Sequence, residues 1–225
     1  MKLVIFDCDG TIVDSQNGIY EAMQHAYGAL GLAAPKRCDT VSIIGLSLPE
    51  AFAALSPGES HATRRALAEH YKQAFTGIRH DPTHQEPLFD GAAQVINSLA
   101  RRDDMRLGIA TGKSIRGIVR LFDREGWHEH FATVQTADTH PSKPHPSMIE
   151  TAIAEVGALP SRTVMIGDTS FDIEMARSAG VGAIGVTWGY HPAEVLRAAG
   201  AHALVDDYAE LEDAIERLVA ELEAA

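Results

Sequence analysis

The feature that most constrains the fold of this chain is the regular alternation of helical and strand-like segments after about residue 90. Short apolar runs, typical of buried strands, are separated by longer segments with apolar residues at helical spacing. The spacing predicts strands at 105–111, 131–135, 162–167, 182–187 and 203–205, and helices at 90–102, 114–125, 146–157, 171–179, 192–199 and 207–223. Such alternation is typical of βαβ units and predicts a parallel sheet.

The first part of the chain has a different pattern, with one apolar run at Leu3–Phe6 and then only helical spacing. The predicted helices, separated by Gly and Pro, are 16–31, 47–56 and 59–77. We therefore predict an α/β fold in which a helical unit interrupts a doubly wound, parallel, Rossmann-like sheet domain. The predicted domains are a core of residues 1–14 and 88–225 and an inserted α-helical cap of residues 15–87.

Charge and hydropathy narrow the functional class. The 225 residues carry a formal net charge of −12, whereas nucleic-acid-binding proteins present basic faces to phosphates, so we expect no nucleic-acid partner. The chain has no apolar stretch near the roughly 18 residues of a membrane span and no secretory signal pattern, so we expect a cytoplasmic protein without a membrane partner. An acidic protein that binds an anion needs local positive charge, which favours a divalent cation. The oligomeric state stays open.

Acidic residues follow two of the predicted strands. Asp7 and Asp9 come directly after Leu3–Phe6, and because they are two apart in an extended segment their side chains point the same way. Asp168 follows the strand 162–167, and Asp172 lies one helical turn later. Since the carboxyl ends of parallel strands meet at one edge of a sheet, these four carboxylates are expected to converge.

Two further groups are expected at the same edge. The strand 105–111 ends in Thr111, followed by Gly112 and Lys113, so a hydroxyl and backbone N–H groups lie where a phosphate would bind. Lys143, in the sequence Ser-Lys-Pro, precedes the helix 146–157 and adds an ammonium. We expect Thr111, Gly112, Lys113 and Lys143 to bind substrate.

The charges of this set suggest a division of labour. Four carboxylates exceed the charge of Lys143 and one Mg²⁺, so one carboxylate must carry a proton; we expect this to be Asp9, because crowding by like charges raises a pKa. Asp7 is then the nucleophile that attacks phosphorus, with Mg²⁺ on Asp7 and Asp168. Asp172 is expected to position either Lys143 or a metal-bound water.

Together these residues resemble the four motifs of the haloacid dehalogenase superfamily, namely Asp7-x-Asp9-Gly10-Thr11, Thr111, Lys143-Pro144 and Gly167-Asp168-x-x-x-Asp172. The resemblance spans the chain and is nearest to phosphoglycolate phosphatase-like enzymes with a helical cap. It implies an aspartyl-phosphate mechanism, a small phosphorylated metabolite as substrate, and a cap that closes over it. It also implies Mg²⁺ bound by Asp7, the backbone carbonyl of Asp9, and Asp168.

Other activities of the superfamily fit the sequence less well. Dehalogenases lack the second aspartate of the first motif, which is Asp9 here, and the cap lysines Lys36 and Lys72 do not lie in a phosphonatase motif. A β-phosphoglucomutase-like sugar phosphomutase stays an alternative, although the region of Gly45 and Ser47 has no Arg. The second alternative is a catalytically silent binding or regulatory module. Gly45 and Ser47 are our candidates for substrate binding by the cap.

Several patterns have a simpler structural reading. The glycines of 180–185 match the dinucleotide motif G-x-G-x-x-G, but they end a helix and enter a strand, so we expect a helix C-cap. We expect the pairs His80-Asp81 and His128/His130 to lie in loops rather than to bind metal. The segment Trp188–Tyr190 either lines the route by which substrate enters or simply packs against its neighbours, and both alternatives stay open.

Overall fold

The core of the protein is one parallel sheet. The computed structural model describes residues 1–80 and 86–224. The strands are β1 (Lys2–Phe6), β2 (Met105–Thr111), β3 (Phe131–Thr136), β4 (Thr163–Gly167), β5 (Gly182–Val186) and β6 (Ala203–Val205). They lie in the order β3-β2-β1-β4-β5-β6, and all neighbouring pairs are parallel. This confirms the predicted α/β, Rossmann-like fold.

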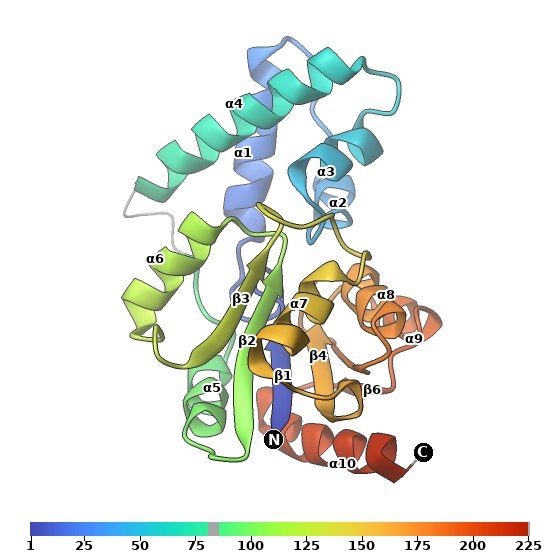
Figure 1. Cartoon of the computed structure of the whole chain (residues 1–225). Coiled ribbons are helices and arrows are strands. Elements are labelled where there is room, and N and C mark those ends of the chain that lie inside the picture. The colour runs from blue at the N-terminus through green and yellow to red at the C-terminus, as the bar shows by residue number, and fades with distance from the viewer. Residues whose placement is uncertain (81–85, 225) are drawn as a thin grey trace.

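Helices cover both faces of this sheet (Figure 1). Alternate residues of β1 point to opposite faces, so Val4 and Phe6 belong to one buried cluster and Leu3 and Ile5 to the other. The first face packs against α5 (Ala92–Ala100), α6 (Ile115–Glu125) and α10 (Leu211–Ala224). The second packs against α7 (Ser147–Val156), α8 (Ser170–Ser178) and α9 (Ala193–Ala198). Each face is therefore buried, as a parallel sheet requires.

Four helices lie beyond the carboxyl ends of the strands (Figure 1). They are α1 (Gln16–Ala29), α2 (Arg37–Val41), α3 (Leu48–Leu55) and α4 (His61–His80). Three of them, α1, α3 and α4, share an apolar cluster in which Tyr27, Phe52 and Tyr71 are buried. The chain leaves the sheet and returns to it at one place, where Val13 bridges Leu88 and the N–H of Asp14 donates to the carbonyl of Pro87 over 2.9 Å. We refer to this helical unit as the cap.

Most predicted elements agree with the structure to within a few residues, but two predictions were wrong. Helix α2 was not predicted, because its five residues are too few to show a helical period. The closing helix was predicted to start at residue 207, whereas Tyr208–Glu210 form a 3₁₀ turn capped by the Asp207 side chain and α10 begins at Leu211.

The reading of the glycine motif at 180–185 is confirmed. Gly180 follows the end of α8 with φ of +69°, a value that favours glycine, and Gly182 starts β5. Within residues 1–80 and 86–224, no helix combines the length and the apolar character that crossing a membrane demands.

Candidate active site

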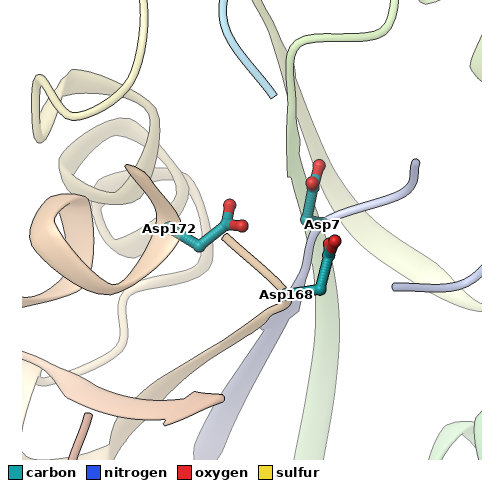
Figure 2. Close-up of side chains that lie close together, drawn as sticks. All are labelled: Asp7, Asp168 and Asp172. Carbon is teal, nitrogen blue, oxygen red and sulfur yellow. The ribbon is translucent and has the colours of Figure 1, made fainter. Parts of the chain in front are cut away.

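Three aspartates meet at the carboxyl edge of the sheet. Asp7 follows β1 and Asp168 follows β4, and these strands are neighbours. Asp172, in the first turn of α8, points toward both (Figure 2). All three side chains are buried, and a carboxylate oxygen from each lies within 4.8 Å of the others. The predicted convergence of Asp7, Asp168 and Asp172 is thus present in the structure.

The Asp168 carboxylate is held by two donors. The Thr11 hydroxyl donates to Oδ1 over 2.9 Å and the N–H of Tyr190 donates to Oδ2 over 2.8 Å. Gly10, with φ of +91°, passes so close that a Cβ there would lie 2.2 Å from Asp168 Oδ2. Only glycine lets the backbone after Asp9 approach this carboxylate.

Lys143 lies fully buried between two of these aspartates. Its Nζ is 2.6 Å from Asp172 Oδ1 and 2.8 Å from Asp7 Oδ1. The other oxygen of Asp172 accepts hydrogen bonds from the N–H and the hydroxyl of Thr169, over 3.0 and 2.7 Å. Both oxygens of Asp172 are therefore engaged by protein groups, which favours the reading in which Asp172 positions Lys143.

Burial of these charges shifts their pKa values. Burial raises the pKa of Asp7 to about 6, because the opposing effect of Lys143 is smaller and Asp172 adds repulsion. Burial and the carboxylates of Asp172 and Asp7 raise the pKa of Asp168 far above its usual value. For Lys143, burial acts to lower the pKa, but Asp172 and Asp7 outweigh it and keep the ammonium charged. When Asp7 and Asp168 are both ionised, the protein groups around them do not supply enough positive charge to balance the two carboxylates.

This imbalance fits a divalent cation. Neither oxygen of Asp7 accepts a well-formed hydrogen bond, although both are buried and Lys143 lies beside one of them. Buried carboxylate oxygens without donors are costly unless a cation receives them, and carboxylates are the ligands that Mg²⁺ prefers. Asp7 and Asp168 bring carboxylate oxygens together where such an ion would bind, and their role as Mg²⁺ ligands stays a prediction.

Asp9 lies outside this cluster, in a different environment from the one predicted. Its carboxylate Oδ1 is 2.6 Å from the Nζ of Lys113, and this Nζ also lies 3.3 Å from a carboxylate oxygen of Glu86. The charge argument that placed the extra proton on Asp9 assumed crowding by like charges and omitted Lys113. Lys113 adds a positive charge beside Asp9, and the protonation of Asp9 stays a prediction.

The cap meets the core beside Thr111. The Thr111 side chain is buried, and its hydroxyl accepts a hydrogen bond from the N–H of Lys113 over 3.2 Å. Gly112 faces the cap so closely that a Cβ would lie 2.8 Å from the carbonyl oxygen of Gly45. The N–H of Ser47 donates to the hydroxyl of Ser142 in the core over 2.8 Å. The loop that carries Gly45 and Ser47 thus rests on the loop after β2.

A cleft of about 1050 Å³ opens between the cap and the core. Most of the predicted site residues line it: Asp7, Asp9, Gly45, Ser47, Thr111, Gly112 and Lys113. Lys143, Asp168 and Asp172 are buried and do not line it. Asp7 is therefore the point at which the buried charge cluster reaches the space open to a substrate.

The segment Trp188–Tyr190 serves to hold the site rather than to line the cleft. The indole N–H of Trp188 and the hydroxyl of Tyr208 both donate to the carbonyl of Thr11, over 3.1 and 2.8 Å. The Tyr190 hydroxyl accepts a hydrogen bond from the N–H of Ser15, just before α1. Sequence reasoning placed this segment at the correct edge, but side-chain direction was not predictable from strand order.

The histidine pairs supply no metal site among the described residues. Nε2 of His128 lies 2.8 Å from an oxygen of Asp123, and Nε2 of His130 lies 2.9 Å from the side-chain oxygen of Asn97. His80 is the last residue of α4, so the prediction that it lies in a loop was wrong; Asp81 lies outside the described residues.

Comparisons with known proteins agree with this geometry. A family model of haloacid dehalogenase-like hydrolases matches residues 4–186. The chain is 35% identical to a probable phosphatase, IndB, of Dickeya dadantii, over 96% of this chain and 94% of the relative. It is 29% identical to a phosphoglycolate phosphatase of Agrobacterium fabrum, over 99% and 96%. A crystal structure of a hydrolase from Pseudomonas syringae has the same fold, with a TM-score of 0.84, 23% identity and coverage of 96% and 99%.

Proposed function

The chain belongs to the haloacid dehalogenase-like hydrolases, and from this premise we propose that it is a Mg²⁺-dependent phosphatase of a small phosphomonoester. Phosphoglycolate-like compounds and other phosphorylated metabolites are the substrates we consider. The observation that carries the proposal is Asp7. Its carboxylate is buried, lies 2.8 Å from Lys143, keeps both oxygens without a well-formed hydrogen bond, and lines the cleft.

Asp7 is proposed to be the nucleophile. Its carboxylate attacks phosphorus, the bond from phosphorus to the ester oxygen breaks, and an aspartyl phosphate forms. The Lys143 ammonium beside Asp7 neutralises the phosphoryl oxygens, and the Thr111 hydroxyl with nearby backbone N–H groups binds the others. Asp172, engaged by Thr169 and Lys143, keeps that ammonium in place.

Asp9 is proposed to carry the proton. It protonates the leaving alkoxide, and the resulting carboxylate takes a proton from the water that hydrolyses the aspartyl phosphate. Because Asp9 contacts Lys113 in the structure, it must part from that ammonium, or share it with substrate, before it can donate. Bound Mg²⁺ would offset the charge of Asp7 and of the phosphoryl group; Asp7, Asp168 and the backbone carbonyl of Asp9 would hold it.

Two other functions remain distinguishable by experiment. A sugar phosphomutase would return the phosphoryl group to a sugar hydroxyl instead of water, and a silent binding module would not turn over at all. A panel of phosphoglycolate, sugar phosphates, nucleotides and pyrophosphate, assayed for released phosphate, separates hydrolysis from these two outcomes.

The test of the proposed function is hydrolysis of p-nitrophenyl phosphate. We expect turnover that requires Mg²⁺, is lost in Asp7→Asn, and persists in the control Asp123→Asn, which changes an exposed aspartate of α6. Activity that survives Asp7→Asn would rule out Asp7 as the nucleophile, and a wild-type protein without turnover would favour the silent module.

A further inference from the structure

The cleft is larger than the reaction itself requires. Its volume of about 1050 Å³ lies at the upper end of the range for sites that enclose drug-sized ligands. The phosphoryl group occupies the end formed by Asp7 and Thr111 in the proposed function. Most of the cleft is then available to the leaving group. The side chains that line the cleft therefore indicate which chemical groups the leaving group carries.

The cap wall of the cleft is apolar and partly aromatic. Ile19 and Met23 of α1 line it together with Tyr71 and Phe75 of α4. The rings of Tyr71 and Phe75 are stacked, with centroids 5.4 Å apart and planes 21° from parallel. Such a wall favours an apolar or planar part in the leaving group.

Basic residues outnumber acidic ones at the exposed edge of the cleft, where the acidic residues are Glu50, Glu69 and Asp138, although the chain as a whole carries −12. We call Arg65 and Lys72 of α4 and Arg116 and Arg120 of α6 the basic rim; all four are exposed and line the cleft. Figure 1 shows α4 above α6, with one helix in the cap and the other in the core. Positively charged side chains of the cap and of the core therefore border the same opening of the cleft.

Lys72 and Arg116 can be placed relative to Asp7 and Asp9 through the contact between Lys113 and the ring of Phe75. The Nζ of Lys113 lies 6.0 Å from the centre of the Phe75 ring, which brings the start of α6 near α4. Lys72 precedes Phe75 by three residues, about one turn of α4, and Arg116 lies in the first turn of α6, three residues after Lys113. Lys113 contacts Asp9, the proposed proton carrier, so Lys72 and Arg116, which line the same cleft at exposed positions, lie on the side of this contact that faces solvent.

The positive charge of the rim is only partly neutralised by the protein. Lys72 pairs with Glu69 at 2.9 Å, an exposed contact that contributes little stability and can be exchanged for a ligand. Arg65 and Arg116 form no salt bridge within residues 1–80 and 86–224. The nearby Asp138 carboxylate is engaged by the N–H of Ile115. Electrostatic attraction to a second anionic group is thus built into the opening.

We propose that the substrate is a phosphate monoester whose leaving group has an apolar section against Tyr71 and Phe75 and ends in a second anionic group bound between Lys72 and Arg116. This inference rests on the proposed phosphatase function and specifies its substrate class. A two-carbon acid such as glycolate is too short to place its carboxylate there while its phosphate is at Asp7, so phosphoglycolate is expected to be a poor substrate.

The test compares two aryl esters of matched shape, 4-carboxyphenyl phosphate and its neutral amide, 4-carbamoylphenyl phosphate. We expect the wild-type protein to favour the carboxylate by roughly tenfold in kcat/KM, the effect of one good charge-assisted contact. The double variant Lys72→Gln/Arg116→Gln should bring this ratio close to one. The control Arg101→Gln/Arg217→Gln removes the same charge from exposed residues that do not line the cleft, and should keep the wild-type ratio.

A second arm uses alkyl esters, with phosphoglycolate against O-phosphorylated 6-hydroxyhexanoic acid; the longer acid is expected to have the higher kcat/KM. Turnover of p-nitrophenyl phosphate without any preference for the carboxylate would overturn this inference and leave the proposed function intact. A preference that persists in the Lys72/Arg116 variant, or a preference for phosphoglycolate over the longer acid, would also overturn it. Absence of turnover with every ester would contradict the proposed function itself.

Discussion

At the scale of single residues, the two aspartates of the first motif differ in what surrounds them. Asp7 is buried beside Lys143 and close to Asp168 and Asp172, whereas Asp9 contacts Lys113. Two carboxylates in neighbouring but different environments are suited to different tasks, one as nucleophile and one as proton carrier.

The role of Asp9 predicts a dependence on the leaving group. In Asp9→Asn, hydrolysis of an alkyl phosphate should fall about 100-fold or more, because an alkoxide leaves poorly without a proton. Hydrolysis of p-nitrophenyl phosphate should fall much less, because p-nitrophenolate needs no proton to leave. The measurement is kcat/KM for both esters in both proteins, and equal losses on the two would contradict the proton-carrier role.

Residue identities at the site were predictable from sequence, but their contacts were only partly so. Asp7, Thr111 and Asp168 were found because each follows a strand of a parallel sheet, and strand ends converge. The pairing of Asp9 with Lys113 joins residues 104 positions apart through side-chain directions, which no strand pattern specifies. The donors to Asp168 and Thr11 from the loop after β5 were missed for the same reason.

At the scale of elements, the cap is tied to the core by a few polar contacts beside the site. The Tyr190 hydroxyl accepts from the N–H of Ser15 over 3.1 Å, while the N–H of Tyr190 donates to Asp168. One residue thus contacts both the start of α1 and a proposed metal ligand. Helices α1, α3 and α4 were predictable from apolar spacing, but α2 was not, because five residues show no helical period. The contacts of Tyr190 were not predictable either, because they join residues far apart in the sequence.

Removal of the Tyr190 hydroxyl tests whether this residue connects the cap to the site. In Tyr190→Phe, the N–H of Ser15 loses its acceptor, and we expect KM to rise roughly three- to tenfold through looser seating of the cap, with a smaller change in kcat. Tyr27→Phe is the matched control, because it removes a tyrosine–serine hydrogen bond that lies wholly within the cap, to Ser56. Steady-state kinetics measure both variants, and a KM effect of equal size in Tyr27→Phe would argue against a specific role for Tyr190.

At the scale of the whole molecule, the buried carboxylates couple stability to pH and to metal. Burial raises the folded-state pKa of Asp7 to about 6, above the value near 4 of an exposed aspartate, and it also raises the pKa of Asp168. A raised pKa of this kind stabilises the fold fully below the unfolded-state pKa, and the contribution is lost as the pH rises through the folded-state pKa. Without metal, the folded protein should therefore lose stability between about pH 4 and pH 7.

Unfolding in urea at pH 5 and pH 8 measures this coupling. Between pH 5 and pH 8 in a chelator, the raised pKa of Asp7 alone accounts for a loss of about 1.4 kcal/mol, so Asp7→Asn should be less sensitive to the change in pH than the wild-type protein. Mg²⁺ should restore the wild-type stability at pH 8, and the exposed-residue control Glu174→Gln should behave as wild type. The same pH dependence in Asp7→Asn as in the wild type would show that Asp7 is not the group concerned.

The central claim is that Asp7 accepts the phosphoryl group, and acid quenching during turnover tests it most directly. The reaction with Mg²⁺ and a phosphate monoester is stopped within milliseconds, and mass spectrometry locates the phosphoryl group in the digested protein. We predict a hydroxylamine-sensitive phosphoryl group on the peptide that carries Asp7, and none in Asp7→Asn. Two results together would contradict the claim. The wild-type protein would turn over substrate while the quenched peptide never carries phosphate, and Asp7→Asn would turn over substrate as well.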